Sequence, residues 1–267
     1  MQNVSVLSWN IQGKVNITGY TFFNKVKSHL ISYSPDIIAL QEMCDAEKIL
    51  KNIQAFKKYN MFIPKFNRGG DSRNPGFNHN VLLIKYPILR ADEITFPQWN
   101  QNAPLENCTR ADIQLNNQVL RIYNCHFAIF KVGIATRLKQ LQYILSDSRS
   151  HKGPIIICGD MNVTIPKMGW NRKVIARWHQ EPAQEMSING TLIDYDEREL
   201  FDKTISQYGF EEVLDLYTPT WSPFKSKIWE MFKLKLDWFM VKNVEVTNVK
   251  LGDYVSDHRP IEVQCRL

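Results

Sequence analysis

The sequence predicts a mixed α/β fold, and two kinds of pattern support that prediction. Short apolar runs bounded by turn residues, such as 154–158, are typical of buried strands. Between such runs lie segments with apolar residues at helical spacing, such as Phe22, Val26 and Leu30. The first unit is therefore a strand over 3–9, a helix over 20–33 that ends before Pro35, and a strand over 36–40.

The same patterns predict the remaining elements. Further helices are expected at 45–57, 134–145 and 197–208. Further strands are expected at 59–64, 80–85, 109–115, 119–126, 154–158, 211–216, 234–241, 244–251 and 260–265. Asn116 and Asn117 suit the turn of a hairpin between two of these strands. The chain shows no linker, repeat or low-complexity tract, so one domain over 1–267 is expected, with an elaborated loop region at about 163–200.

Composition limits the class of protein. A chain of 267 residues with 44% hydrophobic residues can bury a large core. It has no apolar stretch of membrane-spanning length and no signal-peptide pattern at its start, so a cytoplasmic location is expected. The five cysteines are odd in number and lack metal-knuckle spacing, which favours reduced, buried thiols. We also expect a monomer.

The net charge of +6 favours an anionic partner. The stretches 167–178 and 221–235 interleave lysine or arginine with aromatic residues, a mixture that can neutralise phosphates and stack bases. Each stretch is equally consistent with a solvated face over core aromatics. Nucleic acid is therefore the expected partner, and the residues of the candidate site indicate the chemistry that the protein could perform on it.

Polar side chains recur where predicted strands end. Burying such groups is costly unless they are paired or functional. The residues are Asn10, Glu42, His126, Asp160, Asn162, Asp237, Asp257 and His258.

This set fits metal-assisted attack of water on a phosphate ester. Oxygen ligands for a hard divalent cation are available from Asn10, Glu42 and Asp257. Mg²⁺ is the expected ion, and Mn²⁺ meets the same requirement. His126 and Asn162 can donate to a charged transition state. Water can be oriented by Asp160, or deprotonated by His258 when Asp237 holds the imidazole. Zinc is disfavoured because no close His or Cys pairs occur.

Six motifs resemble, in order, those of the endonuclease/exonuclease/phosphatase superfamily with its deoxyribonuclease I-like fold. They run from residue 8 to 260, at 8–12, 38–42, 124–126, 159–162, 236–239 and 256–260. The resemblance implies a four-layer α/β/β/α sandwich, with two central, mostly antiparallel sheets flanked by helices. It also implies a magnesium-dependent phosphoesterase site at one edge of the sheets.

Carried over by motif, Glu42 and Asn10 would bind the metal, with Asp257 as a further ligand. Asp160 would orient water, and Asn162 and His126 would contact the scissile phosphate. His258 would pair with Asp237, and both Asp160 and His258 remain candidates for the general base. Arg110 resembles a substrate-backbone contact of the deoxyribonuclease branch, and a plain surface charge is an equal alternative.

Two positions differ from the patterns of particular branches of this superfamily. His126 stands where abasic-site endonucleases carry Tyr, and Trp238 follows Asp237 where inositol polyphosphate 5-phosphatases carry Arg. The first hypothesis is a nuclease acting on DNA or RNA. The alternative is a phosphatase or phospholipase-like enzyme acting on phosphoinositide or sphingomyelin headgroups at a membrane surface. A catalytically silent binding protein is disfavoured, because all eight polar strand-end groups are present.

Overall fold

The computed structural model describes residues 1–12, 17–44, 46–64, 79–97, 107–129, 133–163, 187–188, 191–192, 197–222, 224–225 and 227–267. Its helices are α1 (Ile17–Tyr33), α2 (Ala46–Leu50), α3 (Ile134–Ser148) and α5 (Glu197–Gln207), with 3-10 turns η1 (Gln54–Phe56) and η3 (Lys227–Phe232). Its strands are β1 (Asn3–Asn10), β2 (Ile37–Met43), β3 (Asn60–Phe62), β4 (His79–Ile84), β5 (Ile88–Thr95), β6 (Asn107–Leu115), β7 (Gln118–His126), β8 (Ile155–Asp160), β9 (Ser187–Ile188), β10 (Thr191–Leu192), β11 (Glu211–Glu212), β12 (Asp237–Lys242), β13 (Glu245–Leu251) and β14 (Ile261–Arg266).

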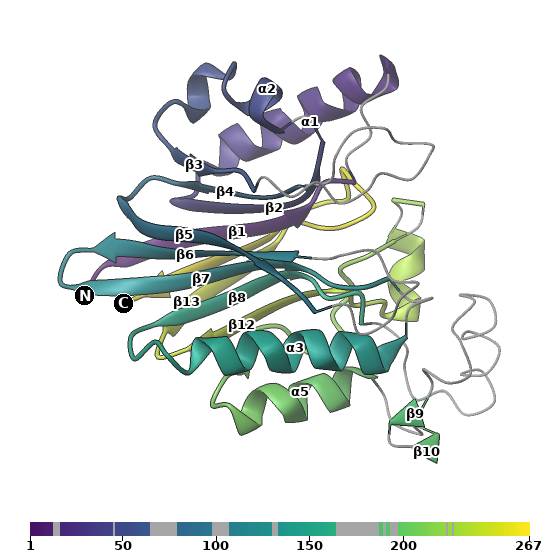
Figure 1. Cartoon of the computed structure of the whole chain (residues 1–267). Coiled ribbons are helices and arrows are strands. Elements are labelled where there is room, and N and C mark those ends of the chain that lie inside the picture. The colour runs from purple at the N-terminus through teal and green to yellow at the C-terminus, as the bar shows by residue number, and fades with distance from the viewer. Residues whose placement is uncertain are drawn as a thin grey trace.

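Two six-stranded sheets form the centre of the molecule (Figure 1). The first has the order β13-β14-β1-β2-β4-β3, and the second has the order β11-β12-β8-β7-β6-β5. Each sheet contains one parallel pair, β1 with β2 and β7 with β8. The other pairings of these sheets are antiparallel, as expected. A helix connects each parallel pair, as crossovers between parallel strands require.

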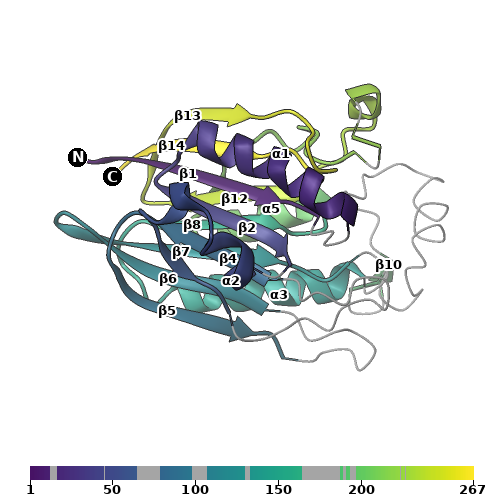
Figure 2. The same ribbon diagram turned by 90° about the horizontal axis from the view of Figure 1, so that it is seen from above.

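Three apolar layers hold the sandwich together. One lies between the two sheets and includes Val6 and Ile122. A second joins the outer face of the first sheet to α1 and α2, and a third joins the outer face of the second sheet to α3 and α5. Seen from above, α1 crosses over the first sheet (Figure 2). The four-layer α/β/β/α architecture is therefore confirmed.

The strands change from apolar to polar as they approach one end of the sandwich. In β7, Ile122 packs between the sheets, and the next side chains on the same face belong to Asn124 and His126. β1 and β8 follow the same pattern and end in Asn10 and Asp160. Because these strands end together, the inner face of the sandwich changes there from a core into a polar site.

One predicted helix is shorter than expected. The expectation for 45–57 is wrong beyond α2, because Ile53 has the extended backbone angles φ −96° and ψ 113°. The side chain of Asn52 donates to the carbonyl of Lys48 at 2.7 Å, which satisfies one acceptor at the helix end. A separate 3-10 turn, η1, then follows.

Two strand predictions also need correction, and the six-stranded sheets contain one further strand. The edge strand β5 was not predicted, because Arg90, Asp92 and Glu93 interrupt its apolar pattern. The strand expected at 211–216 is only β11, and the strand expected at 234–241 begins at Asp237. Outside these shorter strands, the backbone carbonyls of Leu214 and Asp215 accept hydrogen bonds from the side-chain Nζ of Lys235.

All five cysteines are buried free thiols. No helix within the described ranges is both long and apolar enough to cross a membrane. Most of the loop region at 163–200 lies outside the described residues.

Candidate active site

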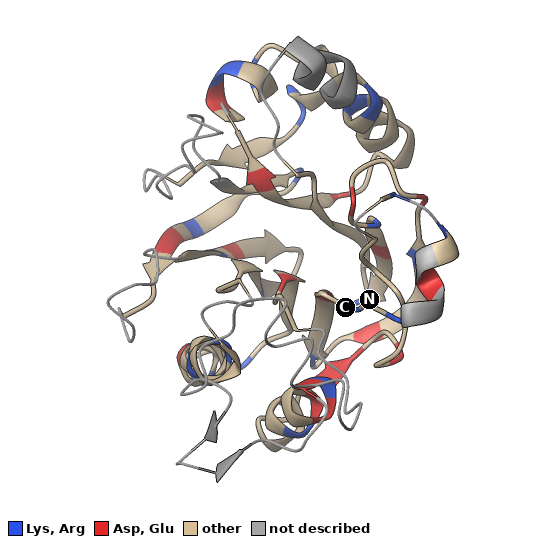
Figure 3. Cartoon of the chain, turned by 90° about the vertical axis from the view of Figure 1, so that its right-hand side faces the viewer, with Lys and Arg blue, Asp and Glu red and all other residues tan. Residues whose placement is uncertain are grey.

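The polar strand ends of both sheets meet at one edge of the sandwich. Figure 3 looks onto this end, where acidic segments lie on both sheets. Strand register brings several predicted residues together directly. His126 lies opposite Asp160 in the parallel β7–β8 pair, and Asp160 lies opposite Asp237 in the antiparallel β8–β12 pair.

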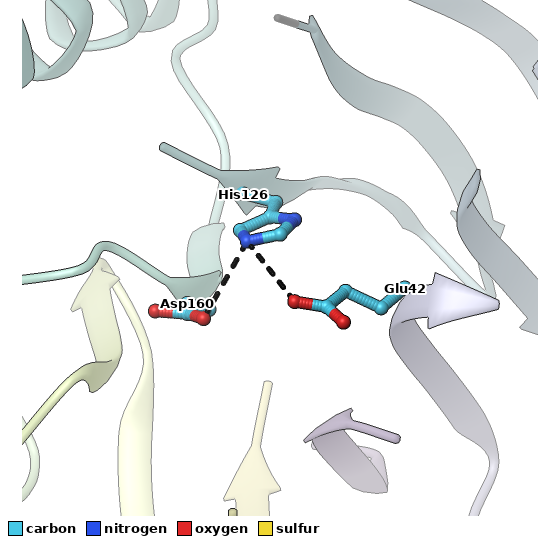
Figure 4. A group of neighbouring side chains, drawn as sticks. All are labelled: Glu42, His126 and Asp160. Atoms are coloured by element: carbon cyan, nitrogen blue, oxygen red, sulfur yellow. Dashed lines mark ion pairs between the residues drawn. The ribbon is translucent and has the colours of Figure 1, made fainter. Parts of the chain in front are cut away.

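Glu42, His126 and Asp160 form the centre of the cluster (Figure 4). The Nε2 atom of His126 lies 3.6 Å from Oε1 of Glu42 and 3.5 Å from Oδ2 of Asp160. Asn10 joins the two carboxylates, since its Nδ2 donates to Glu42 at 3.1 Å and to Asp160 at 2.9 Å. Asp160 is buried, whereas the side chain of Glu42 is 28% exposed, so the cluster opens to solvent on the Glu42 side.

His258 occupies the opposite side of Asp160. Its Nδ1 lies 2.8 Å from Oδ2 of Asp237, and its Nε2 lies 3.7 Å from Oδ2 of Asp160. The backbone around this ring is also fixed. The Ser256 hydroxyl accepts from the His258 amide at 3.0 Å, and the Trp9 indole donates to the His258 carbonyl at 3.1 Å. The pairing of His258 with Asp237 gives the imidazole a defined orientation.

The pKa values of Asp160 and His258 both differ from those of free side chains. Burial raises the pKa of Asp160 to about 7, opposed by His258 and reinforced by Asp237. Burial disfavours the charged imidazolium, yet the pKa of His258 is held well above its ordinary value. The cause is the negative charge of Asp237, Asp160 and Asp257 around the ring. The surrounding carboxylates therefore favour the protonated form of His258.

Asn162 is held close to Asp160. Its backbone amide donates to Oδ1 of Asp160 at 2.9 Å, and its side chain donates to the carbonyl of Phe127 at 3.0 Å. Asn162 has a left-handed φ of 53°, which Asn adopts more readily than most residues. This turn fixes the orientation of the Asp160 carboxylate.

Asp257 is connected to the cluster through Gln12. Nε2 of Gln12 donates to Oδ2 of Asp257 at 2.9 Å, and the Gln12 amide donates to Oδ1 of Asn10 at 2.9 Å. The Trp221 indole also donates to Oδ2 of Asp257, at 3.3 Å. Oδ1 of Asp257 and Oε1 of Gln12 are buried and have no hydrogen-bond partner among the described residues. The site therefore contains oxygen atoms that need a positively charged or donating partner.

The cluster fits a hard divalent cation on the chemistry of its donors. Carboxylate and amide oxygens supply the ligands that Mg²⁺ prefers. Single ligand atoms of Glu42, His126 and Asp160 all lie within 4.8 Å of one another. Those of Asp160, Asp237 and His258 meet the same limit.

Arg110 is the predicted site residue that lies apart from the cluster. Its guanidinium donates to Asp147 of α3 at 2.8 Å and to Asp92 of β5 at 2.7 Å, beside a pocket of about 520 Å³. These bonds place the side chain on the helix-covered face of the second sheet, because Asp147 belongs to α3. The other eight predicted residues lie at the strand-end edge. Asn10 and Asn162 are hydrogen-bonded to the central cluster, and Asp257 is connected to it through Gln12. His258 lies 3.7 Å from Asp160 and is bonded to Asp237.

Sequence reasoning missed Gln12 and the contact of Trp221 with Asp257. Gln12 stands two residues after Asn10, where a turn back to the Asn10 side chain is a common local pattern. No local pattern could have predicted the bond from Trp221 to Asp257, because 36 residues separate them.

The chain matches a family model. The model of the endonuclease/exonuclease/phosphatase family aligns with residues 7–258. Among curated proteins, tyrosyl-DNA phosphodiesterase 2 of Danio rerio is 25% identical over 162 residues, which is 60% of this chain and 41% of that protein. The chain thus matches less than half the length of this relative.

Solved structures share the fold over the whole chain. An endonuclease/exonuclease/phosphatase structure from Bacteroides vulgatus superposes with a TM-score of 0.73 at 16% identity, covering 100% of both chains. A Danio rerio TDP2 structure complexed with a single-stranded DNA product gives a TM-score of 0.66 at 20% identity, again covering 100% of both chains. The family match spans nearly all of the sequence, and the fold agrees with it. The chain therefore belongs to the endonuclease/exonuclease/phosphatase family.

Proposed function

We propose that this protein is a Mg²⁺-dependent phosphodiesterase that hydrolyses phosphodiester bonds in DNA or RNA. The observation that carries the proposal is the convergence of Glu42 and Asp160, from opposite sheets, on Nε2 of His126. Two carboxylates, an imidazole and a bridging amide at an open edge can together hold a divalent cation and bind a phosphodiester, as metal-assisted hydrolysis needs.

Glu42 and Asn10 would hold the cation, with Asp257 as a further ligand. Bound there, Mg²⁺ would neutralise charge that develops on the phosphate. His126 and Asn162 would donate to the phosphate oxygens, which stabilises the transition state more than the ground state.

Asp160 is the group we assign to the attacking water. Nε2 of His258 lies 3.7 Å from Oδ2 of Asp160, which would place the imidazole beside the same water and the bound phosphate. Asp160 is buried, and its backbone partner Asn162 fixes its orientation, so it can align a water molecule for in-line attack. Asp237 would hold the imidazole of His258 in place.

A surface beside the site supports nucleic acid as the substrate class. Trp221 forms a β-bridge with His258, so the following segment lies next to the cluster. In that segment Phe224 is 67% exposed and Ile228 is 77% exposed, and the exposed Lys225 and Lys227 lie near them in sequence. Exposed aromatic and cationic side chains together can stack bases and neutralise phosphates. The stretch 167–178 lies outside the described residues.

Hydrolysis of a substrate panel tests this proposal. The panel contains plasmid DNA, single-stranded DNA and RNA oligonucleotides, sphingomyelin and a phosphoinositide, each with Mg²⁺ or with chelator and at two salt concentrations. We expect Mg²⁺-dependent cleavage of nucleic acid whose kcat/KM falls as salt rises. Activity confined to the lipids would overturn the nucleic-acid proposal and assign the exposed segment to a membrane surface.

A matched pair of variants tests the surface itself. Phe224→Ala should raise KM for a single-stranded oligonucleotide by about 10-fold, since stacking contributes roughly 1–3 kcal/mol per base. Leu89→Ala is the control, because Leu89 is 57% exposed but lies on β5, away from His258 in the sequence and in the sheets. Equal effects of the two substitutions would show that Phe224 does not contact substrate.

A further inference from the structure

The strand that carries Glu42 contains a β-bulge at the site. In the antiparallel β2–β4 pair, Leu40 lies opposite Val81 and Met43 lies opposite His79. Gln41 and Glu42 together therefore face the single residue Asn80. Glu42 has a left-handed φ of 56°, an uncommon conformation for a residue with a long side chain.

Without this bulge, Glu42 would face the wrong side of the sheet. Ile37 and Ala39 pack between the sheets, whereas Ile38 and Leu40 pack under the helices. Strict alternation would thus turn Glu42 toward the helices. The extra residue instead lets Met43 enter the helix-side core, while Glu42 reaches toward His126 and Asp160.

A bulge interrupts the ladder and leaves backbone carbonyls that need other donors. Asn124, on β7 of the other sheet, supplies them. Its Nδ2 donates to the carbonyl of Leu40 at 3.0 Å and to that of Val81 at 2.9 Å, and these two residues lie opposite each other on β2 and β4 as the last pair before the bulge. Its Oδ1 accepts from Nε2 of Gln41 at 2.7 Å, so a bulge residue is bonded directly to the opposite sheet.

Both side chains that form these hydrogen bonds are buried. Gln41 and Asn124 are both 0% exposed, in a layer that is otherwise mostly apolar. Buried amides without partners are costly, so the two side chains strongly disfavour other arrangements of the two strands. Asn124 is also two residues before His126 on the same face of β7, so the Gln41–Asn124 contact lies next to the strand position of the imidazole.

We propose that Gln41 and Asn124 form an inter-sheet amide clamp that holds the β2 bulge and so aims Glu42 into the cation site. They are positioning residues, which do not contact substrate or metal themselves. This inference rests on the proposed function, because it takes Glu42 to be a metal ligand.

Mn²⁺ binding, followed by electron paramagnetic resonance of the purified protein, tests the clamp apart from turnover. Asn124→Leu removes the amide with a side chain of similar size. We expect its Kd for Mn²⁺ to rise at least about 10-fold, which is the usual effect of losing a group that orients a ligand. Gln41→Met leaves the bonds from Asn124 to the bulge carbonyls intact, so a smaller rise is expected, and it replaces Asn124→Leu if that variant does not fold.

Ile122→Ala is the matched control. Ile122 lies on the same strand and the same inner face as Asn124, and belongs to the apolar layer between the sheets. It should lower the thermal stability while leaving the Kd for Mn²⁺ unchanged. Clamp variants that lose stability but bind Mn²⁺ as tightly as the wild type would overturn the positioning role and leave the proposed function intact. A wild-type protein that neither binds Mn²⁺ nor hydrolyses a phosphodiester would overturn the proposed function, and the clamp's role with it.

Discussion

His258 and Asp237 form a close contact in the site, with Nδ1 of the imidazole 2.8 Å from Oδ2 of the carboxylate. Both side chains are buried, so water screens their interaction only weakly. The contact leaves Nε2 directed to the Asp160 side, at 3.7 Å. Asp237 thus orients the ring and, with Asp160 and Asp257, favours its protonated form.

Removing the charge of Asp237 should lower the pKa of His258. In Asp237→Asn the imidazolium loses a neighbouring negative charge and a charge-assisted hydrogen bond, both of which favour protonation. NMR titration of the ring in the wild type and the variant measures this change. An unchanged titration would show that Asp237 does not control the ring.

His258→Ala should reduce kcat by roughly 10²–10⁴-fold, the usual contribution of a positioned proton donor or acceptor. The fold should persist, because the Trp9 and Ser256 contacts in this loop are made to the His258 backbone. Kinetics and circular dichroism of the same preparation check both statements. His151→Ala, which alters a partly exposed histidine bonded to the carbonyl of Val119, is the control for general effects of losing a histidine.

The contribution of Asp160 to the stability of the chelator-treated protein should fall as the pH rises from about 4 to about 7. The unfolded chain loses the Asp160 proton near pH 3.8, whereas the folded protein keeps it to about pH 7. This carboxyl therefore favours folding fully below pH 3.8, and that contribution is lost as the pH approaches 7. The raised pKa of His258 acts in the same direction, because its stabilisation is complete below pH 6.5 and lost above the folded-state pKa.

Urea unfolding across this pH range in wild type and Asp160→Asn measures the effect. The free energy of unfolding should change less with pH in the variant than in the wild type. Over this range the two changes should differ by at most about 4 kcal/mol. Parallel curves would mean that Asp160 titrates normally in the folded protein.

A buried ion pair outside the site offers a separate test of stability. Nζ of Lys235 lies 3.1 Å from Oε1 of Glu212, and the ammonium also lies 4.3 Å from the Trp238 ring centroid. Lys235→Met should cost about 3–5 kcal/mol, because it leaves the Glu212 carboxylate buried without its cation. Adding Glu212→Gln should recover part of that loss.

The exposed pair Lys51–Glu47 is the control for the buried pair. Its side chains are 61% and 71% exposed, so Lys51→Met should change the free energy of unfolding by less than about 1 kcal/mol. Equal costs for Lys51→Met and Lys235→Met in chemical denaturation would contradict the predicted difference.

Gly159 should not tolerate a side chain. A Cβ there would lie 2.0 Å from the carbonyl oxygen of Cys125, and the residue has a φ of 133°. Gly159→Ala should therefore cost more than about 3 kcal/mol, through both the clash and the backbone strain. Gly209→Ala separates the two causes. Gly209 also has a positive φ, of 75°, but its nearest neighbour is 3.6 Å away, so only about 1 kcal/mol is expected in the same denaturation experiment.

The sequence predicted most of the site because strand alternation carries the information locally. His126 and Asp160 each end an apolar strand, and the inward position of each follows from its spacing to buried neighbours. The role of Gln41 could not be inferred in the same way. It depends on a bulge and on a partner 83 residues away, and neither leaves a local pattern.

The misses in the fold have a similar origin. β5 carries charges because it is an edge strand, so its pattern is that of a loop. Lys235 was placed in a strand by alternation, yet its ammonium is buried against Glu212 and the strand begins two residues later. Arg110 illustrates the limit for function, since ion pairing with Asp92 and Asp147 depends on tertiary neighbours that spacing does not reveal.

The most direct test is a Mg²⁺ titration of oligonucleotide hydrolysis by wild type, Glu42→Gln and the surface control Glu47→Gln. We expect the Mg²⁺ concentration for half-maximal activity to rise at least about 10-fold in Glu42→Gln and to stay unchanged in Glu47→Gln. Superimposable titrations of wild type and Glu42→Gln would contradict the assignment of the strand-end cluster as a cation site.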